Sequence, residues 1–405
     1  MSDSHNSDSD FLEFNPETDA EEPSPFAVEF LDESPEPDSP VLWHRLPSPG
    51  ILGAIGWSAL ALILHLIGGV IALAIILSMA IAKHNIPPEK VNELAKDEES
   101  LLALMEQSPG VLLGAEMVTF LVGVLALTLY YYRANLRAAL PLQTPRWQHV
   151  LLILAWFMPL SIFCSQLGVW ASIGWSEFAS KIPQLAPFQE FKMTEEVSRM
   201  TEHLSFGAML FLIAIVPAIA EELIFRGIIG RGLLARFGVA GILLTTIFFA
   251  GVHMHPVHVI AVVPLSIAIH WGYLATRNLW IPMLAHFLNN SWAVVIMYAT
   301  KHIEDEPTEA ILADEAFLPL GVTLSAFACS LAIGWLIWEM RTIYLKPDRE
   351  RWELPFLSTD RPPTELGCTA VLTRPSAASI AAGALGMILF WGLFVSFVVS
   401  QAGQS

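Results

Sequence analysis

Long apolar runs alternate with short polar segments along most of this chain. A helix that crosses a bilayer needs about 20 mostly apolar residues, and a window of that length finds nine such runs. Only HMHPVH separates the short fifth run from the sixth, so these two could instead form one broken or re-entrant unit, which would reduce the count to eight. The nine runs lie at 51–82, 110–132, 149–173, 204–225, 239–254, 257–275, 280–299, 316–340 and 376–400.

The composition supports a membrane protein. Of 405 residues, 54% are hydrophobic and 15% charged, which is too apolar for a soluble protein of this length. The sequence shows no internal repeat and no alternating strand pattern, and prolines between the last two runs argue against a compact extra domain there. We predict an all-α, polytopic membrane helix bundle of about eight to nine transmembrane helices, with the bilayer as a partner and no nucleic acid.

The formal charge of −18 is concentrated at the start of the chain, where the first 44 residues hold 13 Asp or Glu and no Lys or Arg. A segment so rich in Ser, Pro and acids cannot bury enough apolar surface to offset its ordering entropy. Residues 1–48 are therefore predicted to be a disordered acidic tail. Its phrases FLEF and FAVEFLDE could dock on a partner, although a solvated tail is the simpler interpretation.

Basic residues indicate the orientation. If the tail is cytoplasmic, the inner segments hold 14 of the 21 Lys and Arg residues, and the outer ones carry acidic stretches such as KDEES and IEDEPTEAILADE. The positive-inside rule then places the N-terminus in the cytoplasm and the last residue outside, in a plasma or inner membrane. Cys164, Cys329 and Cys368 are too far apart in sequence for a metal motif or a disulfide framework.

Two carboxylates and an arginine interrupt the fourth apolar run. Ionisable groups inside a bilayer are costly, so each is a candidate functional group. Glu222 and Arg226 are four residues apart and can pair on one helix face, whereas Glu221 points about 100° away. The alternative is that all three mark the cytoplasmic boundary, with GIIGRGLLARFG continuing as an amphipathic surface helix.

Histidines form the second group, in FFAGVHMHPVH. Imidazole is a common metal ligand, but His253 and His255 cannot face one site from a regular helix, and Pro256 indicates that the helix ends. We expect His253 to be functional and His255 and His258 to lie at the outer boundary. His65 and His270, single histidines in apolar runs, are expected to serve packing or hydrogen bonding.

The third group, AHFLNNSW, places His286 and Asn290 on one helix face. Alone, these would be ordinary interhelical hydrogen-bonding residues. Counted by helical rise, however, all three groups reach similar depths and could converge. A carboxylate, a histidine and two donors can activate water against a carbonyl and stabilise the oxyanion. The sequence contains neither HExxH nor a GxGD pair, so intramembrane peptide hydrolysis would depend on these three groups.

Three motifs in order, EExxxR (Glu221, Glu222, Arg226), FxxxH (Phe249, His253) and HxxxN (His286, Asn290), resemble those of the CAAX-protease and bacteriocin-processing family of intramembrane proteases, also described as the Abi family. The resemblance covers about a quarter of the chain, within 204–300. It implies a type II CAAX prenyl endopeptidase-like enzyme acting on a peptide or a prenylated protein.

The resemblance also implies roles for these residues. Glu221 would be the water-activating base with His253, while His286 and Asn290 would form the oxyanion pocket. Glu222 and Arg226 would orient the first helix. We favour glutamate-activated water with no required cofactor; if zinc binds in a metalloprotease, its ligands would be Glu221, His253 and His286.

A non-catalytic membrane protein remains the alternative, either a bacteriocin-immunity or regulatory factor on the same fold, or a transporter or scaffold, because transporters also place carboxylates near the bilayer midplane. We divide the chain into the tail 1–48, N-terminal transmembrane helices 49–203, the catalytic core 204–300, and C-terminal transmembrane helices with a cytoplasmic loop, 301–405.

Overall fold

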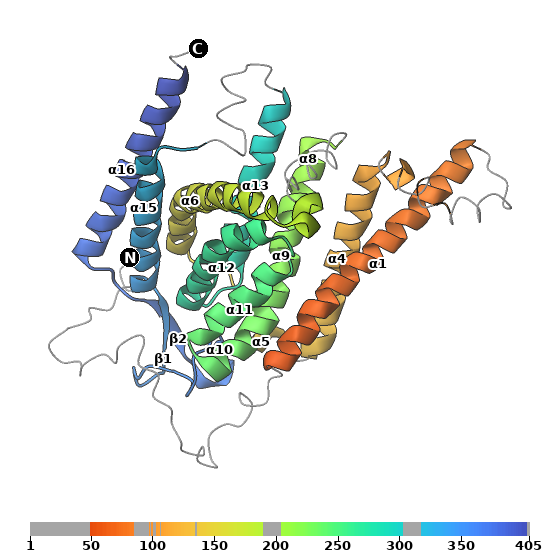
Figure 1. The fold of residues 1–405 in the computed structure, drawn as a ribbon. Coiled ribbons are helices and arrows are strands. Elements are labelled where there is room, and N and C mark those ends of the chain that lie inside the picture. Colours follow the sequence, from red (N-terminus) through yellow and green to blue (C-terminus); the bar gives the residue numbers. More distant parts are fainter. Residues whose placement is uncertain are drawn as a thin grey trace, which may run out of the picture.

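The computed structural model is a bundle of long helices (Figure 1) and describes residues 49–84, 97, 99, 103–105, 107–133, 136–188, 204–302 and 317–402. The predicted acidic tail, 1–48, and the acidic stretch IEDEPTEAILADE lie outside the described residues, as does most of KDEES. Their predicted properties stay predictions.

Each of the nine apolar runs forms a helix. The fourth run extends beyond its predicted end into a continuous series of helical segments: α8 Phe206–Met209, η4 Leu210–Ile215, α9 Val216–Glu222, η5 Leu223–Gly230 and α10 Arg231–Phe237. The other eight are α1 Ile51–His84, α4 Pro109–Tyr132, α6 Trp147–Ala179, α11 Ala240–Gly251, α12 Pro256–Thr276, α13 Trp280–His302, α15 Leu320–Glu339 and α16 Ala377–Ala402.

Within the described ranges, seven helices are long and apolar enough to cross a membrane, which fits a multi-pass membrane protein. The other two runs, which form α11 and α13, are not among these seven for two separate reasons. With 12 residues, α11 is too short, whereas α13 has 23 residues but carries His286, Asn289 and Asn290 in its middle. The predicted all-helical membrane bundle is thus confirmed.

Two short strands depart from the all-helical expectation. β1 Thr342–Leu345 and β2 Thr369–Leu372 pair antiparallel, with Thr342 opposite Leu372 and Leu345 opposite Thr369. Four residues are too few for an alternating pattern to stand out in the sequence. We call the end of the bundle that carries these strands the sheet end. The remaining short elements are α5 Leu136–Ala139 and the 3₁₀ helices η3 Pro183–Phe188 and η6 Thr364–Leu366.

Local chemistry sets several helix ends. Ser205 caps α8, where its Oγ accepts a hydrogen bond from the Ala208 N–H at 3.3 Å. Gly238 adopts a positive φ of 53° directly after α10, a conformation that glycine enters at little cost. Arg277 ends α12 in the left-handed region with φ of 48°, and its N–H donates to the Tyr273 carbonyl. The turns at Gly238 and Arg277 reverse the chain at the sheet end (Figure 1).

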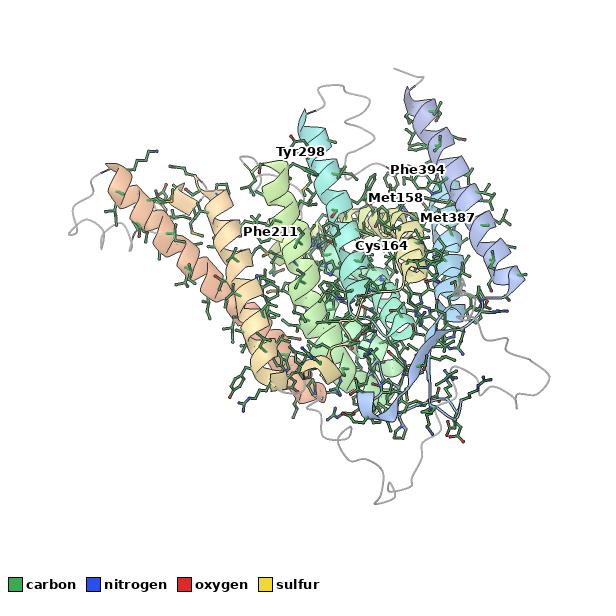
Figure 2. All side chains as sticks on the ribbon, turned by 180° about the vertical axis from the view of Figure 1, so that it is seen from behind. Met158, Cys164, Phe211, Tyr298, Met387 and Phe394 are labelled. Atoms are coloured by element: carbon green, nitrogen blue, oxygen red, sulfur yellow. The ribbon has the colours of Figure 1, made fainter. Side chains whose placement is uncertain are left out.

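Two large apolar clusters form most of the core, and a small third one contains Leu234, Ile242 and Leu274. One large cluster joins α1, α4, α9, η5 and α11, and includes Phe120, Ala220 and Phe249. The other joins α6, α12, α13, α15 and α16 around Trp156 and Cys164; Figure 2 shows Met158, Met387 and Phe394 beside it. The fourth run and α13 therefore lie where the two halves of the bundle meet.

Polar contacts close the sheet end. Arg146 Nη2 donates to the Ala370 carbonyl at 2.5 Å, and Gln143 Nε2 donates to the Arg277 carbonyl at 3.0 Å. A buried ion pair joins Arg231 of α10 to Asp360 in the segment between β1 and β2. The long loop before α16 is thus packed against the helices rather than separate from them.

Candidate active site

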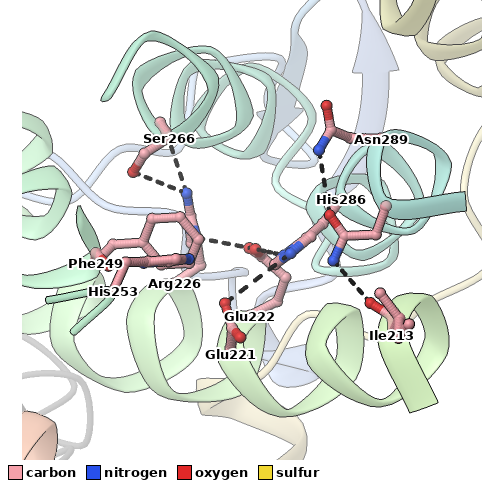
Figure 3. Close-up of polar contacts among 10 residues, drawn as sticks. Ile213, Glu221, Glu222, Arg226, Phe249, His253, Ser266, His286 and Asn289 are labelled. Atoms are coloured by element: carbon pink, nitrogen blue, oxygen red, sulfur yellow. Dashed lines mark hydrogen bonds and ion pairs between the residues drawn. The ribbon is translucent and has the colours of Figure 1, made fainter. Parts of the chain in front are cut away.

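Glu222 is the central residue of the site (Figure 3). Its Oε1 atom lies 2.8 Å from Arg226 Nη1 and 2.8 Å from His286 Nδ1. All three side chains are almost completely buried. An ionised carboxylate only accepts hydrogen bonds, so beside it His286 donates from Nδ1. Glu222 therefore links the first and third sequence motifs through direct contacts.

Arg226 of the first motif packs against Phe249 of the second motif. Its guanidinium carbon sits 4.4 Å from the centre of the Phe249 ring, a cation–π arrangement. Its Nη2 atom donates to Ser266 of α12, to Oγ at 3.0 Å and to the carbonyl at 3.2 Å. Ser266 in turn donates to Thr246 Oγ1 at 3.1 Å. Four helical elements thus hold this one buried cation.

Glu221 faces the other side of the same histidine. Its Oε2 atom lies 4.0 Å from His286 Nε2, and the side chain keeps 18% of its surface exposed, against 0% for Glu222. Glu221 Oε2 has no hydrogen-bond partner among the described residues. Glu222 Oε2 also has no hydrogen-bond partner among the described residues, but Glu222 Oε1 holds both Arg226 and His286. Glu221 is therefore the more accessible and less restrained of the two carboxylates.

His253 contributes from the end of α11. Its Nδ1 atom lies 2.9 Å from the Phe249 carbonyl, which only accepts, so Nδ1 is the donor and Nε2 is left as an acceptor. Its ring contacts the Phe249 ring at 5.3 Å between centroids. Within the described part of the chain, no hydrogen bond or ion pair links His253 to Glu221.

Asn290 lies one turn beyond His286 on α13. Its Nδ2 atom donates to the Ile213 carbonyl of η4 at 3.0 Å, and its Oδ1 accepts from Asn289 Nδ2 at 3.2 Å. Asn289 Oδ1 accepts from Ser161 of α6 at 2.9 Å. One N–H of the Asn290 amide is used by the backbone contact, and the amide has a second.

The carboxylates sit between two π-helical segments, η4 before α9 and η5 after it. Such segments are rare and frequently occur at functional sites. Here η4 presents the Ile213 carbonyl to Asn290, while η5 carries Arg226. All eight η5 residues are buried, as are the first four residues of α10, 231–234. The part of GIIGRGLLARFG up to Leu234 is therefore not a surface helix.

Sequence reasoning missed the polar residues that support these groups. Four small polar residues in apolar helices do this, and nothing in the sequence around them shows which residues they contact: Ser161, Thr246, Ser266 and Asn289. His65 does have a hydrogen-bonding role, 2.9 Å from Glu116 Oε1 between α1 and α4. His270 is completely buried, and neither of its ring nitrogens has a partner among the described residues.

Together these features define a class: a multi-pass membrane protein with a buried carboxylate–histidine network inside its helix bundle. Residues 203–292 match the family model described as "Type II CAAX prenyl endopeptidase Rce1-like". This stretch of the chain is therefore an Rce1-like domain, and the resemblance found in the three motifs is confirmed.

A curated relative points to the same class. The Bacillus subtilis (strain 168) protein named "Putative membrane peptidase YdiL" is 29% identical over 105 residues, which cover 25% of this chain and 43% of that protein. The matched stretch thus spans less than half of the relative. No solved structure matches the chain significantly. Both sequence matches support an intramembrane protease at the level of the family.

Proposed function

We propose that this protein is an intramembrane endopeptidase that hydrolyses a peptide bond of a membrane-associated or prenylated, CAAX-type protein or peptide. One observation carries the proposal most directly. Glu221 faces His286 and keeps 18% of its side chain exposed, while the adjacent Glu222 is completely buried and paired with Arg226. A partly exposed carboxylate beside an oriented imidazole, inside a membrane bundle, suits the activation of water.

In the proposed reaction, Glu221 removes a proton from water as the water oxygen attacks the carbonyl carbon of the substrate. The carbonyl oxygen becomes an oxyanion, and the second N–H of Asn290, with His286 when its Nε2 is protonated, donates to it. Collapse of this intermediate breaks the C–N bond, and the proton held by Glu221 passes to the leaving amine. His253 positions the water through its free Nε2 atom.

The supporting residues keep these groups in place. Glu222 holds the His286 ring through Nδ1, and Arg226 balances the charge of Glu222 in a buried setting. Phe249 packs against both Arg226 and His286. We infer that Glu222, Arg226 and Phe249 orient the site without touching the substrate.

The zinc alternative finds little support in the arrangement of ligands. Within the described residues there is no group of three or more His, Cys, Asp or Glu side chains that could hold a metal ion. We therefore propose a reaction in which no step uses a metal, and the chelator arm of the test below decides between this reaction and the zinc alternative.

The test is peptide cleavage by the full chain purified into liposomes, with prenylated CAAX peptides and unmodified membrane peptides as substrates. We expect cleavage that Glu221→Gln and Asn290→Ala each reduce by about 100-fold or more, and that a chelator leaves unchanged. Glu177→Gln, at an exposed carboxylate paired with Lys181, is the control and should cleave normally.

Two outcomes would count against this proposal. Cleavage that survives Glu221→Gln would remove the assigned base, and loss of cleavage on chelation would replace the mechanism with a metal-dependent one. If wild-type protein cleaved none of the peptides, a non-catalytic role as an immunity or regulatory factor, or as a transporter or scaffold, would become the better account.

A further inference from the structure

We propose that Asp360, which lies in the loop between β1 and β2 and outside the Rce1-like domain, is a positioning residue for the candidate active site. It would act through Arg231 by fixing the helical register of η5, the segment between the site and the sheet end. The catalytic consequence rests on the proposed peptidase function, whereas the structural consequence can be tested without it.

The contact between the two residues is direct and bidentate. Arg231 Nε lies 2.7 Å from Asp360 Oδ1, and Arg231 Nη2 lies 2.9 Å from Asp360 Oδ2. Only 5% of Arg231 and 2% of Asp360 are exposed. Two parallel hydrogen bonds from a planar guanidinium define its orientation as well as its position. Asp360 therefore constrains the rotation of α10 about its own axis as well as the distance between α10 and the loop.

The segment around Asp360 is itself anchored. The Asp360 N–H donates to Ser358 Oγ at 2.9 Å, and Ser358 and Thr359 are buried beneath the helices. The chain on either side leads into β1 and β2, which hydrogen-bond to each other. Asp360 is thus held independently of α10 and can serve as a fixed point for it.

The π-helical geometry of η5 makes that fixed point relevant to the site. A π-helix forms i→i+5 hydrogen bonds and so holds one more residue per hydrogen-bonded turn than an α-helix. If η5 became α-helical, Arg231 would turn by about 100° relative to Glu222. Contacts at both ends, Glu222 with His286 and Arg231 with Asp360, would then be incompatible. The ion pair between Arg231 and Asp360, at the end of η5 nearer the strands, therefore favours the π-helical register over the α-helical one.

A second contact from outside the domain points the same way. The Tyr132 hydroxyl of α4 donates to the Gly227 carbonyl, in the middle of η5, at 2.6 Å. Tyr132 is 1% exposed. A carbonyl that accepts a side-chain hydroxyl is stabilised outside the regular helical ladder. Tyr132 therefore holds the middle of η5, and Asp360 holds the residue that directly follows it, Arg231.

The experiment measures kcat and KM for cleavage of a prenylated CAAX peptide by the full chain in liposomes, together with thermal unfolding. Asp360→Asn removes the carboxylate that faces the buried Arg231 charge, so a loss of activity in this variant alone would not separate positioning from folding. The double substitution Arg231→Met with Asp360→Leu removes both charges and replaces them with apolar side chains, a change that often leaves the stability of a protein with a buried ion pair intact.

Two further variants serve as comparisons. Asp360→Glu keeps the carboxylate. The control is Glu353→Gln, which breaks an exposed ion pair with Arg351 in the same loop.

We expect the double variant to unfold at or above the wild-type temperature and to lose about 10- to 100-fold in kcat, as misplacement of a site by about 1 Å would cause. Its KM should stay within about twofold, because the substrate-contacting residues are unchanged. Asp360→Glu should recover part of kcat, and Glu353→Gln should match wild type. A folded double variant with wild-type kcat would overturn the proposal.

A readout independent of catalysis separates this proposal from the proposed function. Glu221→Cys, in a chain whose three native cysteines are replaced by serine, can be labelled with a small methanethiosulfonate reagent. We expect the double substitution at 231 and 360 to change the labelling rate by at least about threefold, because it frees the segment next to residue 221. If wild type cleaves nothing, this rate still decides: an unchanged rate refutes the positioning role, and a changed one supports it.

Discussion

At the scale of single residues, the adjacent carboxylates Glu221 and Glu222 have opposite surroundings. Glu222 accepts hydrogen bonds from both Arg226 and His286 and is completely buried, whereas Glu221 is 18% exposed and only approaches His286, at 4.0 Å. Burying a charge is costly unless a partner offsets its desolvation. The paired carboxylate therefore allows a second, less restrained one to sit beside it in an apolar bundle.

Replacing Glu222 tests this division of roles. Glu222→Gln leaves the Arg226 charge buried without its carboxylate, so we expect a loss of about 3 to 5 kcal/mol in unfolding free energy. Ser266→Ala removes one of several contacts of Arg226 and should cost about 1 kcal/mol. Thermal unfolding of the purified variants in detergent measures both. Equal stability losses would contradict the central role given to Glu222.

At the scale of elements, α1 and α4 form a close pair beside the site. His65 of α1 hydrogen-bonds Glu116 of α4 and stacks on Phe120, with ring centroids 4.1 Å apart. Gly68 lies directly against this contact: a Cβ atom there would come within 2.6 Å of the Glu116 Cα. Small residues at helix crossings allow such close approach in membranes. Phe120 belongs to the same core cluster as Ala220, the neighbour of Glu221 in α9. The crossing of α1 and α4 therefore supports the helix that carries Glu221.

Two neighbouring glycines offer a matched comparison. Gly68→Ala forces the backbones of α1 and α4 apart, and we expect it to lower the unfolding free energy by about 1 to 3 kcal/mol. Gly69→Ala meets nothing within 4 Å and should be neutral or slightly stabilising, since alanine favours helix over glycine. Thermal unfolding of the two variants decides, and a harmless Gly68→Ala would show that the helices are not in close contact.

At the scale of the whole molecule, the sequence predicted the helices well because apolar runs of about 20 residues have few alternatives. Counting helical rise predicted that EExxxR and HxxxN reach similar depths and could meet, and Glu222 does contact His286. The sequence could not predict that η5 is π-helical or that Asp360 reaches Arg231, because 129 positions separate these partners and no local pattern connects them. The short strands β1 and β2 were missed for a similar reason.

Cys368 provides a native probe of membrane orientation. Cys164 and Cys329 are buried in helices, whereas Cys368 lies in the loop just before β2 and is partly exposed. The excess of arginine on the sheet end predicts that this loop is cytoplasmic. A membrane-impermeant maleimide should then label Cys368 in inside-out vesicles and not in intact cells. Cys368→Ser is the control, and labelling of intact cells would reverse the orientation.

The rate of that labelling should depend on pH. Partial burial raises the pKa of the Cys368 thiol, so only a small fraction is thiolate near neutrality. Because the thiolate is the reactive form, we expect the rate to increase as pH rises toward and beyond the ordinary cysteine pKa. A rate that is independent of pH over this range would contradict the raised pKa.

The short helix α11 has a consequence for the lipid around the protein. Its 12 residues span about 18 Å, well below the roughly 30 Å of a hydrocarbon core, and the turn after it exposes Met254 at a positive φ of 57°. Backbone at that depth needs cover or water, and a bilayer adapts to a short segment by thinning. We therefore expect the proposed peptidase activity to vary with acyl-chain length in liposomes and to be higher in thinner bilayers, so that the host membrane itself would help to set the rate of cleavage.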